Sequence, residues 1–484
     1  MDYVALYARS KPNKIVIKDL AFERQWTFAE LDHAVACCVS VLINKGVERG
    51  SRVACLSKNR AEVLILHFAC ARLGALFVPL NWRLSGAELQ VLVDDCQPVI
   101  RFGDDMAARL GLSMLNIDEL LGLCDASGPT HSSIPDMELP SLMLYTSGTT
   151  GRSKGVLLSE RHIGETAINF GILGEVDGDS GFLCESPMFH IIGAITSVRP
   201  ALLKGAHIVI SDGFEPERTL SRIADPELGI THYFCVPQMA LALRAANNFD
   251  PSQLQNLKAL FTGGAPHPEA QIRDWLRDGI AIVDGYGSSE AGTVFGMPLD
   301  IDVIDKKAGC VGMPTPRVQA RIVDAVGNIL PAGSAGELQL RGQNVTGGYW
   351  QREEDTRNAF TEDGWFCTGD IIVMDEDGFY RCVDRKKDMF ISGGENIYPA
   401  ELEALLVKYP GIKEQAVVGI DDDKWGEVGC VFYVSDSDIE LESIVGYLSD
   451  KIARYKLPKR AVRIEALPRN AAGKVLKPAL KQLA

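Results

Sequence analysis

The N-terminal half of the chain alternates between the hydrophobic periods of helices and strands. In Trp26–Leu31 a Thr precedes a Glu by three residues, a capping box that predicts a helix running to Val41. Arg52–Leu56 predicts a short buried strand, Ala61–Leu73 a helix and Gly74–Leu80 another strand. Strands and helices at these intervals favour parallel α/β sheets. The same alternation recurs further along the chain, at Ala206–Ile210, Pro216–Ile223, His232–Val236 and Leu257–Phe261.

The pattern changes near Gly309. From Gly312 to Arg385 short apolar strands are separated by turn residues, which predicts a small β-rich unit that closes the larger lobe. The charged strip Arg385–Asp388 precedes a new α/β pattern, so we predict one domain over 1–386 and a second over 387–484. The strands of the β-rich part are expected at Ala320–Val323, Glu337–Arg341 and Phe379–Val383, and the elements of the second domain at Pro399–Lys408, Gln415–Ile420, Gly429–Val434 and Leu441–Ile452.

The composition of the 484 residues narrows the class of function. Hydrophobic residues make up 46% and charged residues 23%, the proportions of a globular protein with a large core. The net charge of −15 opposes binding to nucleic acid or to an anionic membrane surface, so we expect neither as a partner. The 12 Cys are scattered without zinc spacing, and Cys70, Cys184 and Cys235 lie in apolar segments. We therefore expect buried thiols and a reducing compartment.

Targeting and membrane signals are not found in this sequence. The N-terminus has no basic segment followed by an apolar core, so we expect no signal peptide. Val63–Leu80, the most apolar stretch, is interrupted by a His and an Arg and makes a poor membrane span. We expect a cytoplasmic protein without a membrane span.

The run Tyr145–Val156 has the chemistry of a phosphate-binding loop. It reads Tyr-Thr-Ser-Gly-Thr-Thr-Gly-Arg-Ser-Lys-Gly-Val and lies between two apolar stretches. Its glycines let the backbone turn so that successive N–H groups face an anion, while the hydroxyls and a lysine add further donors. The spacing differs from the common P-loop, and the alternative is a flexible linker. The expected phosphate-binding residues are Thr146, Ser147, Gly148, Thr149, Thr150, Gly151, Ser153 and Lys154.

Two further turns carry chemistry that suits a nucleotide. In Asp284–Glu290 (Asp-Gly-Tyr-Gly-Ser-Ser-Glu), which we expect to join a strand to a turn, Tyr286 can stack on a flat ring and Glu290 can bind Mg²⁺. In Phe366–Asp370, Asp370 follows a glycine and can accept hydrogen bonds from both hydroxyls of a ribose. Each motif alone has an ordinary explanation as a turn with a capping acid.

Together these motifs resemble the adenylate-forming superfamily, which comprises acyl-CoA synthetases, adenylation domains of peptide synthetases and luciferases. The resemblance extends through nearly the whole chain in the same order. It implies an α/β fold with a large N-terminal lobe of two α/β sheet subdomains plus a small β-barrel-like subdomain. It also implies a small, mobile α+β C-terminal domain.

The resemblance assigns the nucleotide contacts residue by residue. Thr146 and Glu290 are expected to serve Mg²⁺ and catalysis, and Arg385 to make a second contact to the ribose or the phosphates. Ser289 stands where the family usually has Thr, a departure that keeps the hydroxyl. The adenine side is expected to comprise Gly263, Gly264, Ala265, Asp284, Gly285, Tyr286, Gly287, Ser288 and Ser289.

The acid substrate is expected to lie beside Pro187–Gly193. There the resemblance implies that His190 is an aromatic gate and a catalytic residue, whereas a buried, satisfied histidine is the ordinary alternative. Amino-acid-activating relatives usually carry an Asp at this position, so His190 argues against α-amino acids. No arginine is obviously placed for a second carboxylate, although Arg199 is a candidate. The expected acyl pocket comprises His190, Gly193, Val236, Gly264 and Gly287.

The C-terminal part is expected to act by moving. The resemblance implies a hinge at Lys387 and a loop, Gly393–Glu395, that presents Gly393, Gly394 and Glu395 to coenzyme A. It also implies that Lys474 reaches the carboxylate and the α-phosphate, where a cation stabilises the developing charge. Without the resemblance, Lys474 is simply a solvated lysine.

The resulting hypothesis is an ATP-dependent carboxylic acid–CoA ligase. It uses ATP, Mg²⁺ and coenzyme A, releases pyrophosphate as an acyl-adenylate forms, and then transfers the acyl group to the CoA thiol. One alternative is a ligase that loads a carrier-protein thiol, and another is a nucleotide-binding protein without catalysis. The partner is a small-molecule carboxylic acid, which the sequence does not identify, and monomer and homodimer both stay open.

Overall fold

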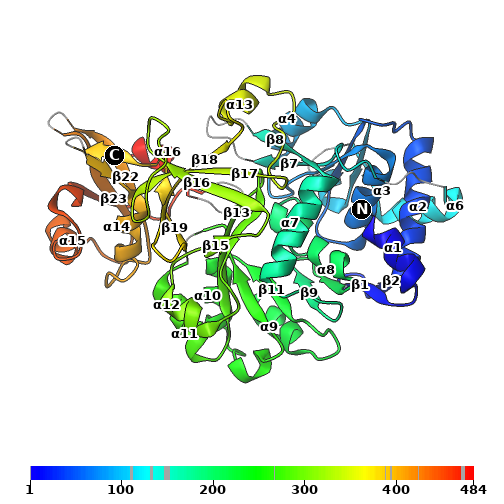
Figure 1. Ribbon diagram of the computed structural model, residues 1–484, viewed down its shortest axis with the longest axis horizontal. Helices are drawn as coiled ribbons and strands as arrows, with labels where there is room; N and C mark the ends of the chain where they lie inside the picture. The colour runs from blue at the N-terminus through cyan, green and yellow to red at the C-terminus, as the bar shows by residue number, and fades with distance from the viewer. Residues whose placement is uncertain are drawn as a thin grey trace. The chain divides into compact units, whose positions relative to one another are not determined.

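The computed structural model describes residues 2–109, 113–130, 135–146, 153–265, 267–386, 388–392, 395–422, 425–469 and 475–484. The chain divides into two compact units. The first comprises Met1–Ala320 and Leu340–Phe366, and the second comprises Arg321–Gln339 and Cys367–Ala484 (Figure 1).

A mostly parallel sheet near the N-terminus of the first unit presents the phosphate-loop hairpin at one edge. β3 pairs in parallel with β4 and β5, and β4 pairs in parallel with β7, as the alternating strand and helix pattern predicts. β7 and β8 are antiparallel neighbours. Among the described residues the sheet has six strands, in the order β6 (Leu115–Asn116), β5 (Ile100–Gly103), β3 (Arg52–Leu56), β4 (Leu76–Pro79), β7 (Pro140–Thr146) and β8 (Lys154–Ser159).

The second sheet of this unit carries the expected adenine side and the expected acyl pocket. β9 to β13 pair in parallel with one another or with β1, whereas β14 turns back antiparallel on β13. Within the described ranges its nine strands follow the order β15 (Met313–Pro314), β14 (Gly292–Gly296), β13 (Ile282–Ser288), β12 (Ala259–Thr262), β11 (His232–Cys235), β9 (Gly181–Cys184), β10 (His207–Ile210), β1 (Ile15–Asp19) and β2 (Arg24–Thr27).

Helices pack against these sheets, and α3 is buried along nearly its whole length. α2 begins with the predicted capping box, since the Thr27 hydroxyl accepts from the Glu30 N–H and the Glu30 carboxylate accepts from the Thr27 N–H. The helices of the first unit are α1 (Tyr3–Ser10), α2 (Phe28–Asn44), α3 (Ala61–Leu73), α4 (Gly86–Cys96), α5 (Asp105–Arg109), α6 (Leu120–Ser127), α7 (Glu160–Leu173), α8 (Arg199–Lys204), α9 (Pro216–Ala224), α10 (Pro237–Ala245), α11 (Glu269–Arg277), α12 (Ile301–Lys306) and α13 (Glu353–Asn358).

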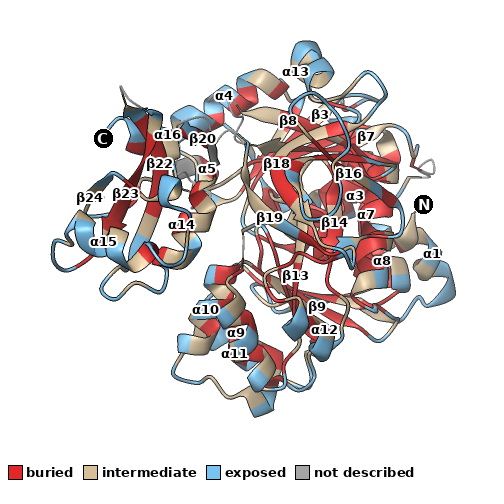
Figure 2. Cartoon of the chain, turned by 60° about the vertical axis from the view of Figure 1, so that its left-hand side comes forward, coloured by how far each residue is buried: buried red, intermediate tan, exposed pale blue. Residues whose placement is uncertain are grey.

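The core of the first unit lies between sheets and helices. Buried residues follow the strands, and exposed residues lie on the outward faces of helices such as α9 and α11 (Figure 2). Cys70, Cys184 and Cys235 are buried, as their apolar neighbours predict. No helix in the described part of the chain is both long and apolar enough for a membrane span.

The second unit contains most of a four-stranded sheet and all of a small α/β sheet. The first has the order β16 (Val318–Val323), β17 (Ala335–Gly342), β18 (Phe366–Met374) and β19 (Tyr380–Arg385). The described strands of the other are β21 (Glu395–Ile397), β20 (Phe390–Ser392), β23 (Gly426–Val434) and β22 (Glu414–Asp422), with β24 (Arg460–Arg463) beside β23. Its helices are α14 (Pro399–Leu406), α15 (Leu441–Leu448) and α16 (Lys477–Lys481).

The predicted fold class is confirmed: a large α/β part with several sheets and a separate C-terminal domain. The compact units, however, group 321–339 and 367–386 with the C-terminal residues. The domain boundary between 386 and 387, and the mobility of the second domain, stay predictions.

Candidate active site

The predicted phosphate loop joins two paired strands. Thr146 at the end of β7 lies opposite Lys154 at the start of β8. The Thr146 hydroxyl donates to the Lys154 carbonyl at 3.4 Å. Both loop ends are thus fixed by the edge of the six-stranded sheet. The loop residues Ser147, Gly148, Thr149, Thr150 and Gly151 lie outside the described residues.

A chain of contacts joins this hairpin to the predicted magnesium ligand. The Lys154 ammonium pairs with Asp355 at 2.6 Å and lies 5.3 Å from the centre of the Tyr349 ring. The Tyr349 hydroxyl donates to Glu290 Oε1 at 3.2 Å. Burial, followed by the charge of Glu290, raises the pKa of Tyr349, so this hydroxyl keeps its proton. One tyrosine therefore contacts Lys154 through its ring and Glu290 through its hydroxyl.

The segment that carries Tyr349 was not predicted from the sequence. Thr346 ties it to both neighbours, because its N–H donates to the Glu290 carbonyl and its hydroxyl donates to the Leu157 carbonyl, each at 2.6 Å. Gly348 has a φ of +141°, and a Cβ there would come within 2.5 Å of Thr356. The pair Gly347-Gly348 before an aromatic residue is the sequence signal that would have drawn attention to this turn.

The expected adenine side rests on a buried polar cluster. Thr262, the last residue of β12, is the register partner of Asp284 within β13, and the Thr262 hydroxyl donates to Asp284 Oδ1 at 3.1 Å. Burial raises the pKa of Asp284 to about 7. His267 Nδ1 lies 3.0 Å from the same hydroxyl, and burial lowers the pKa of His267 to about 4. Asp284 is thus a buried carboxyl held by Thr262.

The strand extends further into the motif after Asp284 than expected, and the turn follows it at 289–291. β13 continues to Ser288, and Tyr286 lies opposite Phe295 of β14 with ring centroids 5.6 Å apart. A Cβ on Gly287 would come within 2.2 Å of the Gly292 carbonyl oxygen. The strand pairing accounts for this glycine, and ring stacking on Tyr286 stays a prediction. Gly263 lies beside Gly285, because a Cβ on Gly263 would come within 3.0 Å of the Gly285 carbonyl oxygen. The remaining adenine-side residues, Gly264, Ala265, Ser288 and Ser289, follow β12 or end β13 in the sequence.

The structure brings together part of the expected acyl pocket. A Cβ on Gly264, whose φ is +82°, would lie 3.9 Å from Val236 Cγ1, so these two residues are neighbours. The ring centroids of His190 and Phe189 lie 4.5 Å apart. Burial, followed by the charge of Arg83, lowers the pKa of His190 to about 4, so the ring is neutral at pH 7.

Gly193 has a packing role that the sequence did not reveal. It lies in a π-helical turn, Ile192–Thr196. A Cβ at this position would come within 2.3 Å of the carbonyl oxygens of Ser186 and Pro187. Close approach of two backbone segments accounts for the glycine, and its place in the acyl pocket stays a prediction.

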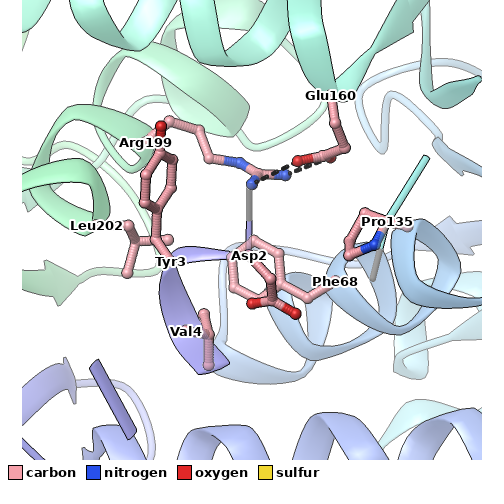
Figure 3. A pocket seen from close by; sticks show the side chains of 9 residues that line it. Asp2, Tyr3, Val4, Phe68, Pro135, Glu160, Arg199 and Leu202 are labelled. Atoms are coloured by element: carbon pink, nitrogen blue, oxygen red, sulfur yellow. Dashed lines mark hydrogen bonds and ion pairs between the residues drawn. The ribbon is translucent and has the colours of Figure 1, made fainter. Parts of the chain in front are cut away.

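Arg199 is wrong as a candidate for a second substrate carboxylate. Its Nη2 lies 3.0 Å from Glu160 Oε1 and its Nη1 lies 3.2 Å from Glu160 Oε2, with both side chains buried. Figure 3 shows the two groups pointing toward each other beside Tyr3 and Phe68. The adjoining cavity of about 20 Å³ suits a single water molecule and excludes an acyl group. The charge of Arg199 is already neutralised.

In the second unit, the two predicted ribose contacts lie side by side. Asp370 and Arg385 are register partners on β18 and β19, and Arg385 Nε lies 2.5 Å from Asp370 Oδ1. The Asp370 N–H donates to the Thr368 hydroxyl at 3.1 Å, after Gly369 with a φ of +69°. The sheet thus presents a carboxylate and a guanidinium together.

Comparisons with known proteins identify the family. The model of the AMP-binding enzyme matches residues 5–350, and that of the AMP-binding enzyme C-terminal domain matches 401–474. The chain is 36% identical to the indoleacetate–CoA ligase of Aromatoleum aromaticum, over 100% of this chain and 97% of the relative. The chain belongs to the AMP-binding enzyme family. Within it, the chain falls in the acyl-CoA ligase branch of the adenylate-forming superfamily.

Two further relatives of this family are similar over nearly the whole chain. A feruloyl-CoA synthase of Amycolatopsis sp is 36% identical over 93% of this chain and 92% of its own. The o-succinylbenzoate CoA synthetase MenE of Bacillus subtilis, solved with the acyl-adenylate OSB-AMP, has a TM-score of 0.90 and 28% identity, covering 99% of this chain and 98% of its own. MenE has also been solved with ATP and a magnesium ion.

Several predicted residues of this AMP-binding enzyme lie outside the described residues or lack a described side chain. These are the hinge residue Lys387, the CoA-loop glycines Gly393 and Gly394, the catalytic Lys474, and the side chain of Glu395. Their roles stay predictions. Ser153 is described at the C-terminal end of the phosphate loop, directly before β8.

The described residues fit a magnesium ion that is held mainly by its nucleotide. Glu290 offers one carboxylate, and the described part of the chain has no cluster of three or more His, Cys, Asp or Glu placed to hold a metal. Mg²⁺ is ordinarily held by one or two carboxylates together with substrate phosphates and water. A single glutamate beside a phosphate-loop hairpin has this donor set.

Proposed function

We propose that this protein joins a ring-bearing carboxylic acid to coenzyme A in two steps that share one site. In the first, a carboxylate oxygen attacks the α-phosphorus of ATP, the bond to the β-phosphate breaks, and pyrophosphate leaves. In the second, the CoA sulfur attacks the acyl carbonyl carbon, its proton is lost, and AMP leaves with the bonding electrons.

The observation that carries this proposal is the contact chain Lys154–Tyr349–Glu290. It joins a cation at the phosphate-loop hairpin to a carboxylate suited to magnesium, through a half-buried tyrosine. Phosphoryl transfer depends on positioning and charge stabilisation more than on covalent chemistry by the protein. When bound, Mg²⁺ neutralises charge on the phosphates. Lys154 and Tyr349 hold the hairpin and Glu290 in place for that complex.

A ring-bearing acid is supported by the relatives and by the expected pocket. The three relatives described above are named for indoleacetate, ferulate and o-succinylbenzoate, which all carry an aromatic ring. His190 and Phe189 offer ring surfaces, and His190 is neutral at pH 7. Gly264 lies beside Val236 and has no side chain, which leaves space at one wall of the expected pocket. Flat apolar acids gain most from such surroundings.

A second substrate class, a ring-bearing acid with another anionic group, is favoured by one observation. The Arg83 side chain lies close enough to His190 to lower the pKa of that histidine, and it lies over the Trp82 ring at 5.0 Å. Unlike Arg199, it makes no ion pair with any residue that the structure describes. A guanidinium that makes no ion pair with the described residues can bind a carboxylate of the substrate.

A substrate panel tests the proposal. Wild-type protein is incubated with ATP, Mg²⁺, CoA and one acid from each class: arylacetate, cinnamate, carboxylated benzoate and straight-chain fatty acid. Release of AMP and formation of the thioester are measured together. We expect the ring-bearing acids to give the highest kcat/KM. Preference for a straight-chain acid contradicts the substrate class, and AMP release that requires a carrier protein instead of CoA contradicts the acceptor.

A further inference from the structure

The loop that carries His190 is fixed at its start by a side chain from the connection that follows a strand of the six-stranded sheet. Asn59 lies between β3 and α3 and is 4% exposed. Its Nδ2 donates to the Ser186 carbonyl at 2.8 Å, and its Oδ1 accepts from the Met188 N–H at 2.8 Å. All the groups in these two bonds are buried. The amide orientation is unambiguous, because a carbonyl can only accept and an N–H can only donate.

The residues on both sides of Asn59 are held by hydrogen bonds and an ion pair. The Lys58 N–H donates to Asp104 at 3.1 Å, and the Ala61 N–H donates to the buried Asp19 at 2.9 Å. Arg60 pairs with the buried Glu62 at 2.9 Å. The residues on both sides of Asn59 are thus held by the six-stranded sheet and its neighbours. A side chain whose own backbone is fixed in this way holds its hydrogen-bonding partners in a defined position.

Contacts within the loop connect the residues that Asn59 binds to His190. The His190 N–H donates to the Pro187 carbonyl at 3.0 Å. Pro187 lies between Ser186 and Met188, the two residues that Asn59 binds. Gly193 packs against the carbonyl oxygens of Ser186 and Pro187, where its Cβ would lie within 2.3 Å of either. The Ser186 carbonyl is therefore fixed by Asn59 and overlain by Gly193. The turn with His190 lies between Ser186 and Gly193 in the sequence.

We propose that Asn59 is a positioning residue for acid binding: its amide sets the loop Ser186–Gly193 and thereby places His190 at the acyl pocket. The inference rests on the proposed function, since it assumes that His190 borders the acid. Asn59 touches neither the phosphate hairpin nor Glu290 in the described contacts. Its loss is expected to weaken use of the acid while leaving use of ATP nearly unchanged.

Two substitutions separate the clamp from general packing. Asn59→Asp is nearly isosteric but places a carboxylate oxygen against the Ser186 carbonyl, so that bond becomes a repulsion. Asn59→Ala removes both bonds without adding a charge. Asn248→Asp is the matched control, because Asn248 Nδ2 also donates to a backbone carbonyl, that of Glu217 at 2.8 Å, on the exposed surface of the same unit.

Pyrophosphate–ATP exchange with a ring-bearing acid measures the effect. We expect both Asn59 variants to raise the KM for the acid at least tenfold and to change the KM for ATP less than twofold, with Asn248→Asp unchanged in both. Combining Asn59→Ala with His190→Ala is expected to raise the acid KM no further than the larger single effect, because both act through one ring. Equal changes in both KM values, or independent effects in the double variant, would overturn the proposal.

A measurement independent of activity separates this inference from the proposed function. Hydrogen exchange followed by mass spectrometry is expected to show at least tenfold faster exchange in the peptide with Met188 in Asn59→Ala, and unchanged exchange in β7. Unchanged exchange at Met188 overturns the clamp whatever the enzyme does. Wild-type protein that uses no carboxylic acid overturns the proposed function and leaves this result standing.

Discussion

Replacing Asp284 by Asn is expected to change how stability depends on pH. Asp284 is buried within β13, and this burial raises its pKa from 3.8 to about 7. A carboxyl whose pKa is raised on folding binds its proton more tightly in the native state. Stability therefore falls as pH rises from the unfolded pKa near 4 to the folded pKa near 7, and is constant above that.

The magnitude follows from the size of the shift. A rise of roughly three units corresponds to about 4 kcal/mol at 1.4 kcal/mol per unit, which is the cost of ionising this group in the folded protein. Between pH 5 and pH 8, wild-type protein is expected to lose roughly 2.5 kcal/mol relative to Asp284→Asn, which has no charge to gain. The Asn side chain keeps one acceptor for the Thr262 hydroxyl, which donates to Asp284 at 3.1 Å.

Urea unfolding without ligands, repeated across pH 5 to 8 on both proteins, measures this difference. Tryptophan fluorescence reports mainly the first unit, which holds five of the six tryptophans: Trp26, Trp82, Trp275, Trp350 and Trp365. Other titrating groups cancel in the comparison of the two proteins. A stability difference that stays constant over this pH range would refute the reasoning, because it would mean that Asp284 is ionised throughout.

Two further substitutions test the contacts of the site. Tyr349→Phe removes the 3.2 Å hydrogen bond to Glu290 and is expected to raise the KM for Mg·ATP roughly fivefold, the equivalent of about 1 kcal/mol, with unaltered circular dichroism; an unchanged KM speaks against a role for this bond. Arg199→Gln leaves Glu160 buried without its cation and is expected to cost about 3 kcal/mol or more of stability in urea unfolding. Full stability combined with a selective loss of dicarboxylate substrates would reinstate Arg199 as a substrate ligand.

Local signals in the sequence predicted the local structure. The helix Ala61–Leu73 was predicted with the bounds it has, and the capping box of α2 forms as expected. Both depend on residues within a few positions of each other, which hydrophobic period and capping chemistry encode directly. The extension of β13 through Ser288 was missed because it depends on pairing with β14, which no local pattern specifies.

Contacts between distant residues were not predictable in the same way. Tyr349 reaches Glu290 across 59 positions, and Asn59 reaches Ser186 across 127. Arg199 looked available as a single arginine after the His190 loop, whereas the fold pairs it with Glu160. Motif spacing thus predicted which residues would face a nucleotide. It carried no information on the side chains that hold those residues in place.

Acid-dependent exchange of pyrophosphate into ATP, with Lys474→Ala beside the wild type, tests the central claim most directly. The account predicts exchange by the wild type without CoA, and loss of at least a hundredfold in the variant, because the cation that the account assigns to the α-phosphate is gone. The variant is still expected to convert a synthetic acyl-adenylate and CoA to the thioester. Undiminished exchange in the variant, or wild-type exchange that does not depend on any carboxylic acid, would contradict the account.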